Sequence, residues 1–284
     1  WGLPTPAFLH GAHDPGPPPG VDRAIEWIFD HLPLAGVQIV LGGLLAVSGR
    51  VTRRSALVIA DVPDARPPAQ LAGGTLDDVA AGLEVLARFH AANWGRRDLD
   101  RHPLVWPLDR TPAVARAAYR RNRDAFVARF GPILGPARIA RMDATQRDAD
   151  LLVRHLASPP WTLLHGDYRL DNLLFRPDGS IVVVDHQGTG RGRPGWDVAY
   201  FVTTALDADH RHAEGDLLAH YHATLVAHGV TDHPLADLVA DVACAKQVFA
   251  HRMVAGDALL DTALDETGTS FVDEMVERLA GWLD

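Results

Sequence analysis

The sequence of 284 residues contains only one cysteine, Cys244, and only one lysine, Lys246. A single cysteine cannot form a disulfide within the chain, which is typical of proteins that work in the reducing cytoplasm. No basic and apolar leader opens the chain, so we expect a cytoplasmic protein without a secretory signal. Because the sequence begins at Trp1 and not at Met, we also expect a fragment or a processed product.

Positive charge is scarce, and the formal net charge is −9 at pH 7 with an isoelectric point near 5.9. Such a chain has no basic field to attract nucleic acid or an anionic membrane surface. We therefore expect a small-molecule or protein partner, no nucleic acid and no membrane.

Long apolar runs are also rare, and the longest uncharged stretch spans residues 32–49. Its length is close to that of a membrane span. It contains Pro33, Gln38, Ser48 and four glycines, however, which favour a buried helix or a pair of strands. Residues 1–20 are rich in Pro and Gly and predict an irregular entry.

Regular structure is predicted more clearly after this region. "SALVIADV" (55–62) predicts a short buried strand, and the prolines that follow it predict a hinge. From Thr75, which has capping-box-like spacing to Asp78, the pattern becomes helical. Further helices are expected over 112 to about 130, 136–157, 213–229, 235–256 and 270–283, around one short β segment. This pattern predicts an α+β fold.

The β segment "LLFRPDGSIVVVD" (173–185) has the composition of a hairpin, because two apolar runs flank Asp178-Gly179. With a two-residue loop, Leu173 faces Val184 and Asn172 faces Asp185, on the same side of the ribbon. A bulged three-residue loop shifts this register by one. The first register predicts that the hairpin brings an amide and a carboxylate to one place.

"LLHGDYRLDN" (163–172) precedes this hairpin and places Asp167 five residues before Asn172. Asp167, Asn172 and Asp185 are then expected to converge, and their oxygens are of the kind that binds Mg²⁺. A carboxylate apart from the metal can orient a hydroxyl and accept its proton. The spacing resembles the kinase pattern H-R-D-x-x-x-x-N followed by a metal-binding Asp. Ordinary turn and cap residues are the alternative for these three positions.

The motifs resemble the aminoglycoside phosphotransferase and choline kinase-like family, in which Gly replaces that Arg. "LLHGDYRLDNLLF" and "IVVVDHQ" are similar to its catalytic loop and metal-binding strand, and "GRGRPGWDVAYFV" is similar to its ecdysteroid kinase-like branch. The similarity extends from about Ala56 to Gly229. It implies a protein kinase-like two-lobed fold with a reduced N-lobe (1–62) and a mostly helical C-lobe (63–284). It also implies Mg²⁺, ATP as phosphoryl donor and a hydroxyl group of a small molecule as acceptor.

The resemblance carries roles over to individual residues. Asp167 corresponds to the catalytic acid-base, while Asn172 and Asp185 correspond to Mg²⁺ ligands. His165 is expected to brace the loop, and Asp197 to accept hydrogen bonds from its backbone, although an N-cap is an alternative role for Asp197. The hinge that faces the adenine corresponds to Ala60, Asp61 and Val62.

The pattern is broken on the N-terminal side of the hinge. The family has a phosphate-covering loop and a strand lysine there, but no lysine precedes Lys246 and residues 14–55 match nothing in that pattern. His186 also stands where the family has an aromatic residue. Without the lysine, the charge of the transferring phosphate is under-compensated. A catalytically impaired pseudokinase or fragment, acting as a nucleotide or small-molecule binding module, is therefore the alternative.

The sequence also contains a glycine pattern and a group of histidines outside the catalytic motifs. Gly190, Gly192 and Gly195 spell G-x-G-x-x-G, but no βαβ unit surrounds them, which disfavours a dinucleotide-dependent oxidoreductase. An activation-segment-like loop, with Arg191 and Arg193 as anion or substrate contacts, is the alternative reading. No P-loop and no G-x-S-x-G is present. The chain also has four histidines in two i, i+2 pairs, and this spacing favours a solvated surface over a metal site. They are His210, His212, His220 and His222.

Overall fold

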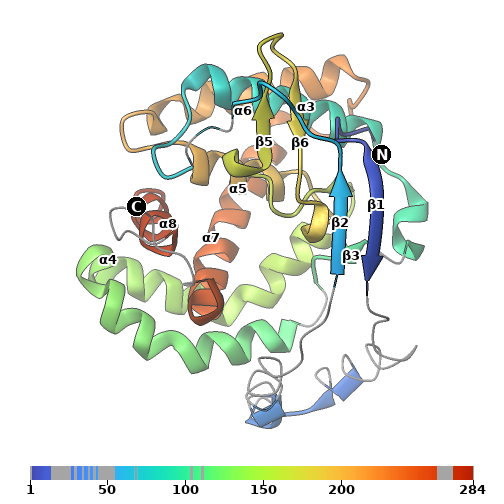
Figure 1. The fold of residues 1–284 in the computed structure, drawn as a ribbon. Coiled ribbons are helices and arrows are strands. Elements are labelled where there is room, and N and C mark those ends of the chain that lie inside the picture. Colours follow the sequence, from blue (N-terminus) through green and yellow to red (C-terminus); the bar gives the residue numbers. More distant parts are fainter. Residues whose placement is uncertain are drawn as a thin grey trace.

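The computed structural model describes residues 2–13, 27–28, 31–33, 35–37, 39–40, 43, 55–66, 68, 70–102, 105–109, 112–260 and 271–283. Most of the chain beyond residue 70 forms helices around three small sheets (Figure 1). In these ranges no helix is both long and apolar enough to cross a membrane. The mixed α+β class expected from the sequence is confirmed.

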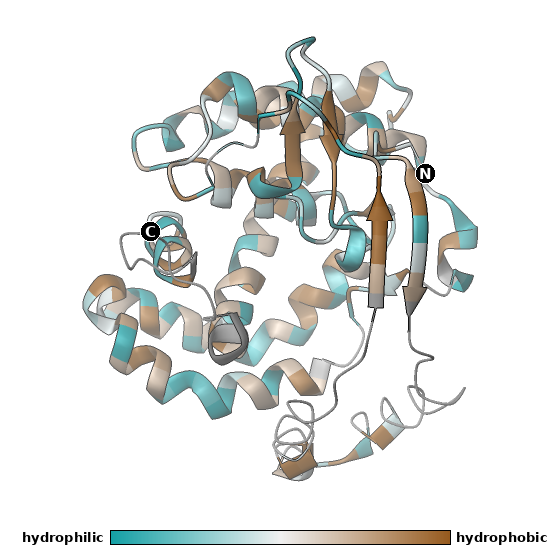
Figure 2. Ribbon diagram, in the orientation of Figure 1, coloured by the Kyte–Doolittle hydropathy of each residue, from teal (hydrophilic) through white to brown (hydrophobic). Residues whose placement is uncertain are grey.

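Strands β1 (Phe8–His13) and β2 (Ser55–Ile59) form an antiparallel pair at one edge of the molecule (Figure 1). The predicted strand at 55–62 is present, but the prediction that it is buried is wrong. Leu57 is 70% exposed and Ile59 is 42% exposed. The reason is that β1 is its one strand neighbour among the described residues, so its faces stay open. Figure 2 shows β2 as mostly hydrophobic despite this exposure.

Most of the expected apolar segment 32–49 falls outside the described residues. Of its described residues, 35–37, 39–40 and 43 are helical, whereas 32 and 33 are not. The irregular entry expected over residues 1–20 is described from 2 to 13, and the prediction is wrong for Phe8–His13, which form β1. Val37 is fully buried and packs against Ala117. A helix is thus favoured over a strand pair at the described residues from 35 to 43.

The predicted helix after Thr75 is confirmed as α3 (Leu76–Ala92). The Thr75 hydroxyl accepts a hydrogen bond from the amide of Asp78 at 3.1 Å, as the capping pattern predicted. Helices α5 (Gly195–Ala205), α6 (Glu214–Ala227), α7 (Leu235–Leu260) and α8 (Phe271–Ala280) complete the helical body with α4.

Helix α4 (Pro112–Ala157) covers the two helices expected at 112 to about 130 and at 136–157. The first continues beyond Phe130 and meets the second at a kink, where Gly135 adopts φ 69° and ψ 165°. Gly135 tolerates this left-handed φ, and Pro136 cannot donate a helical hydrogen bond. The kink therefore lies where the sequence separates the two predicted helices.

Two further small sheets position the polar segment after residue 164. Strand β7 (Gly190–Gly192) lies between β3 (Trp106–Pro107) and β4 (Thr162–Leu164). Strand β5 (Leu173–Phe175) pairs with β6 (Ile181–Val183) as an antiparallel hairpin. Short 3₁₀ turns follow at Leu170–Asn172 and His186–Gly188; two others span Arg97–Arg101 and Arg211–Ala213.

The hairpin forms, but the register expected from a two-residue loop is wrong. Leu173 faces Val183, one residue earlier than expected. The loop contains three residues, because the amide of Arg176 donates to the Ser180 carbonyl at 2.9 Å and Gly179 adopts φ 82°. Pro177 has no amide hydrogen and cannot pair with Ser180, which accounts for the longer loop.

Helix α3 packs closely against α5 at Gly82. A Cβ atom at this position would lie 2.6 Å from Cζ of Phe201 and 3.2 Å from Cδ1 of Leu173. Phe201 and Leu173 are fully buried members of the main core, so neither has space to move away.

Gly82→Ala is therefore expected to lower the free energy of unfolding by about 1–3 kcal/mol through overpacking. Gly215→Ala is the matched control, since a Cβ there meets nothing within 4 Å and the residue lies in α6. The control is expected to be neutral or to stabilise by up to about 1 kcal/mol. Urea denaturation of both variants checks this, and equal stabilities would contradict the close packing.

Candidate active site

The predicted catalytic loop, residues 165–172, leaves the buried strand β4. Leu163 and Leu164 are fully buried, whereas the side chain of Asp167 is 24% exposed. The loop ends in the 3₁₀ turn Leu170–Asn172, from which β5 continues. Its polar side chains are thus presented where the strand leaves the core.

Asp167 and Asn172 are brought together within this loop. Nδ2 of Asn172 donates to the backbone carbonyl of Asp167 at 2.7 Å and lies 3.3 Å from its carboxylate. Because a carbonyl can only accept, the amide nitrogen of Asn172 must face it. The oxygen Oδ1 of this buried side chain then points away from the Asp167 carbonyl and can bind another group.

Asp197 holds the backbone at the start of the loop. Its carboxylate is fully buried and accepts hydrogen bonds from the amides of His165 at 2.7 Å and Gly166 at 2.9 Å. The residue lies in the first turn of α5, where negative charge is favourable, rather than at the N-cap, which is Pro194. Helix α5 thereby positions the residue that precedes Asp167.

His165 links the loop to the segment after β6. Its Nε2 donates to the Val184 carbonyl at 3.0 Å, and its Nδ1 accepts from the Asp167 amide at 3.3 Å. These two bonds define one neutral tautomer of the ring. The ring is buried, so His165 has the contacts of a structural histidine.

Gly166 allows the loop to pass very close to the segment around Gly188. It adopts φ 84°, and a Cβ atom would lie 1.8 Å from the carbonyl oxygen of Gly188. Both the dihedral angle and the contact require glycine here.

Asp185 is not opposite Asn172, because the hairpin register is shifted by one. The amide of Val184 donates to the Asn172 carbonyl at 3.0 Å, and Asp185 follows in the left-handed region with φ 62°. Asp185 is exposed, with Gln187 3.4 Å from its carboxylate. Within the described residues no three His, Cys, Asp or Glu side chains cluster as a metal site.

Two buried residues that sequence reasoning did not select extend the Asp197 contacts. His90 on α3 donates from Nε2 to Asp197 at 3.3 Å, and its Nδ1 lies 2.6 Å from the hydroxyl of Tyr221 on α6. Burial and the charge of Asp197 raise the pKa of Tyr221 well above its usual value, so its phenol stays a donor. The only sign of this contact in the sequence was that His90 lies on the apolar face of the helix predicted after Thr75.

Tyr200 is a third residue that was missed. It lies three residues after Asp197 on α5, and so projects from a similar side of the helix. Burial, followed by the charge and hydrogen bond of Asp167, raises the pKa of Tyr200. The phenol therefore stays protonated near the carboxylate of Asp167.

The predicted hinge connects β2 to the segment beside β5. The amide of Ala60 donates to Ala7 at 2.8 Å, and that of Val62 donates to the Asp61 carboxylate at 2.8 Å. Arg66 and Phe175 then exchange backbone hydrogen bonds of 2.7 and 3.0 Å. These contacts place Ala60, Asp61 and Val62 on a path from the β1–β2 pair to the hairpin.

Two arginines that the sequence offered as anion contacts have protein partners. Arg193 donates to the Pro159 carbonyl at 2.6 Å and lies 3.4 Å from the Asp241 carboxylate. The guanidinium of Arg191 lies 4.2 Å from the ring centre of Trp161. Both therefore hold the segment between β7 and α5 against its neighbours.

The glycines of the G-x-G-x-x-G pattern serve close packing. Gly190 and Gly192 form strand β7, and a Cβ at Gly192 would lie 2.5 Å from Leu108. Gly195 begins α5 and approaches Asp241 equally closely. The pattern thus does not form the strand-to-helix turn that binds a dinucleotide.

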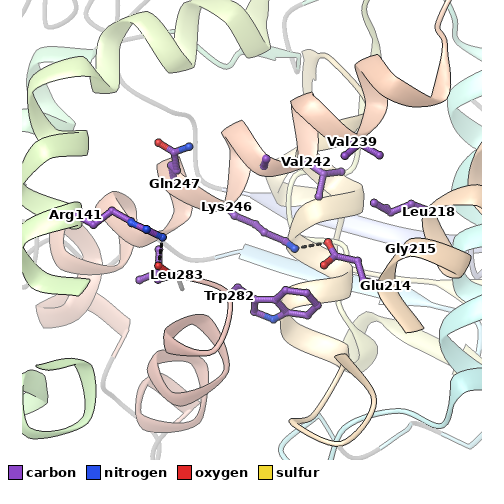
Figure 3. A pocket seen from close by; sticks show the side chains of 11 residues that line it. Arg141, Glu214, Gly215, Leu218, Val239, Val242, Lys246, Gln247, Trp282 and Leu283 are labelled. Carbon is purple, nitrogen blue, oxygen red and sulfur yellow. Dashed lines mark hydrogen bonds and ion pairs between the residues drawn. The ribbon is translucent and has the colours of Figure 1, made fainter. Parts of the chain in front are cut away.

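The only lysine of the chain lies in a separate cavity of about 610 Å³ (Figure 3). Lys246 on α7 pairs with Glu214 and lies 3.6 Å from the ring centre of Trp282. Burial lowers the pKa of Lys246. Its charge is thus engaged by α6 and the C-terminal segment, away from the loop residues described above.

Asp197→Asn replaces an acceptor of three hydrogen bonds by an amide with one acceptor oxygen. We expect the free energy of unfolding to fall by about 1–3 kcal/mol, since buried donors lose their partner. Asp216→Asn, at an exposed position on α6, is the control and is expected to change it by less than about 0.5 kcal/mol. Urea titrations of the two variants test this, and similar losses would contradict the role of Asp197.

The chain is similar to known proteins in sequence and in structure. The sequence model of the phosphotransferase enzyme family (APH) matches residues 58–239, which is more than half of the chain. A search of curated proteins found no match. A solved structure of a microcompartment-associated aminopropanol kinase is similar with a TM-score of 0.56 and 18% identity, over 99% of this chain and 74% of that chain.

Two other solved structures are less similar. A choline/ethanolamine kinase family protein from Mesorhizobium loti has a TM-score of 0.46 and 17% identity, over 79% of this chain and 66% of that chain. An aminoglycoside phosphotransferase from Alicyclobacillus acidocaldarius has a TM-score of 0.45 and 16% identity, over 89% of this chain and 82% of that chain.

The aminopropanol kinase comparison shows the protein kinase-like fold, as the sequence predicted. The family match agrees with the resemblance carried by the catalytic loop, whereas the ecdysteroid kinase-like branch and the boundary at residue 62 stay predictions. The chain therefore belongs to the phosphotransferase enzyme family.

Proposed function

We propose that the chain transfers the γ-phosphate of ATP, with Mg²⁺, to a hydroxyl group of a small molecule. The observation that carries this proposal is the pairing of Asp167 with Asn172 in a loop whose backbone is held by Asp197. Phosphoryl transfer depends mainly on positioning and on stabilisation of charge, which such a loop supports.

Asp167 is proposed to orient the acceptor hydroxyl and to accept its proton. Nδ2 of Asn172 lies 3.3 Å and Nε of Arg169 lies 3.5 Å from its carboxylate, so its direction is set by two donors. Its side chain is partly exposed, which leaves a path for the acceptor. His165 and Asp197 act through the backbone of the loop as positioning residues.

Asn172 and Asp185 are proposed to hold Mg²⁺. The donor set fits this ion, since Oδ1 of Asn172 is turned away from the Asp167 carbonyl and the Asp185 carboxylate is exposed. When bound, Mg²⁺ neutralises negative charge on the phosphate oxygens of the donor. One amide and one carboxylate are few protein ligands, as is usual for Mg²⁺ held together with substrate phosphates.

The hinge residues Ala60, Asp61 and Val62 are proposed to face the adenine. The amides of Ala60 and Val62 already donate within the protein. The amide of Asp61 is then the hinge donor that remains for the base, together with the hinge carbonyls.

A cavity of about 170 Å³ beside the loop is proposed to receive the acceptor. Gly166, the residue before Asp167, and Tyr200, which lies near the Asp167 carboxylate, are among its lining residues. The names of the similar structures suggest amino alcohols or aminoglycosides as one class of acceptor for this cavity.

Asp167→Asn is expected to lower kcat for phosphate transfer by about 10²- to 10⁴-fold, because proton acceptance is lost. Asp185→Ala is expected to lower it comparably through loss of a metal ligand. Asp178→Asn, in the exposed hairpin turn, is the control and should retain activity. Coupled measurement of ADP release with circular dichroism as a check on folding decides this. Wild-type rates in both site variants would refute the assignment.

The alternative is a binding module that retains ATP without transferring its phosphate. The observation that favours it is the engagement of the only lysine, Lys246, with Glu214, so that no lysine compensates the phosphates. Calorimetric titration with ATP, with and without Mg²⁺, separates the two cases when combined with detection of ADP.

Removal of Mg²⁺ by a chelator is expected to weaken ATP binding at least about tenfold, since one ion links two anionic groups. Asp185→Ala should bind ATP equally weakly whether or not Mg²⁺ is present. Tight binding without ADP formation would support the binding module, whereas turnover would rule it out. Binding that does not depend on Mg²⁺ would contradict the metal assignment.

A further inference from the structure

The walls of the acceptor cavity beside Asp167 are made mainly of large apolar side chains. They come from α5, α7 and α8, which meet on this side of the loop. The rings of Trp196 and Phe249 lie 4.6 Å apart between their centres. The volume of about 170 Å³ is close to that of a protein cavity that holds one benzene molecule, about 150 Å³. The apolar wall residues are Trp196, Phe249, Met253, Val272, Met275 and Leu279.

One polar group in these walls has no partner. The hydroxyl of Thr203 is buried and has no hydrogen-bond partner among the described residues. Buried hydroxyls are almost always hydrogen-bonded, so this one is available to a bound molecule. An oxygen on the acceptor, apart from the hydroxyl that reacts, satisfies it.

The only charge that the described lining residues place in the walls is positive. Arg252 stacks on Trp196 with 4.5 Å from the guanidinium carbon to the ring centre, and it lies 3.4 Å from the Leu108 carbonyl. None of the described lining residues carries a carboxylate. The Asp167 carboxylate beside the cavity already has Asn172 at 3.3 Å and the cationic side chain of Arg169 at 3.5 Å. A cationic acceptor would lose water here without gaining a counter-charge.

We propose that the acceptor is an uncharged alcohol with an apolar body of about one ring and a second oxygen, and that Arg252 disfavours cationic acceptors. This inference rests on the proposed function, because it concerns the acceptor of the same reaction. It departs from the amino alcohol class that the similar structures suggest.

Three compounds that share one skeleton test the proposal. They are 3-phenylpropane-1,2-diol, 3-phenylpropan-1-ol, and 2-amino-3-phenylpropan-1-ol, in which an ammonium group replaces the second hydroxyl. For the full chain with Mg-ATP we expect kcat/KM for the diol to exceed that for the amino alcohol at least about tenfold, with the monoalcohol between them. A preference for the amino alcohol would overturn the proposal.

Two substitutions connect this preference to the residues named. Arg252→Glu should reverse the diol preference or reduce it to near unity, while Arg252→Gln, which keeps a donor toward Leu108, should reduce it partly. Thr203→Val should remove the advantage of the diol over the monoalcohol and leave the rate with the monoalcohol nearly unchanged. Selectivity that is the same in wild type and Arg252→Glu would overturn the role of Arg252.

A binding experiment keeps this inference separate from the proposed function. Calorimetric titration of Asp167→Asn with each compound measures affinity without turnover. Selective binding of the diol, with no phosphate transfer in wild type, would refute the kinase mechanism and support the cavity assignment. Phosphate transfer chiefly to the amino alcohol would support the mechanism and refute the cavity assignment. Failure of all three compounds to bind would refute the cavity assignment.

Discussion

The buried carboxylate of Asp197 is the group on which the geometry of the predicted catalytic loop depends. A buried carboxylate is tolerated only while donors surround it, and here they come from the loop backbone and from His90 on another helix. Loop, α3 and α5 must therefore adopt one relative arrangement for the carboxylate to be satisfied. Asp167, next to Gly166, obtains a fixed position from this arrangement while its own side chain stays accessible.

Features that depend on neighbouring residues were predictable from the sequence. The cap at Thr75, the hairpin around Gly179 and the crowding of polar residues after Leu164 follow from propensity, turn chemistry and spacing. The hairpin register was wrong by one because a single residue, Pro177, changed the loop length. The burial of β2 was wrong because a hydrophobic pattern tells which face is apolar but not whether another element covers it.

Contacts between distant segments could not be predicted in the same way. His90 meets a carboxylate 107 residues away, and Arg193 meets Asp241 48 residues away. Nothing local distinguishes such a histidine from one that only fills a core, or such an arginine from one that binds an anion. Tyr200 was missed for a related reason, since its contact with Asp167 depends on how α5 packs beside the loop.

The backbone contact between Gly166 and Gly188 has a consequence for how this chain can change. No side chain fits between the two segments, so they can vary little without losing the loop geometry. The cavity walls, in contrast, are single side chains on three helices that can be exchanged one at a time. If the proposed roles hold, selectivity and chemistry are encoded in different parts of the sequence, and the cavity walls can change while the loop geometry stays fixed.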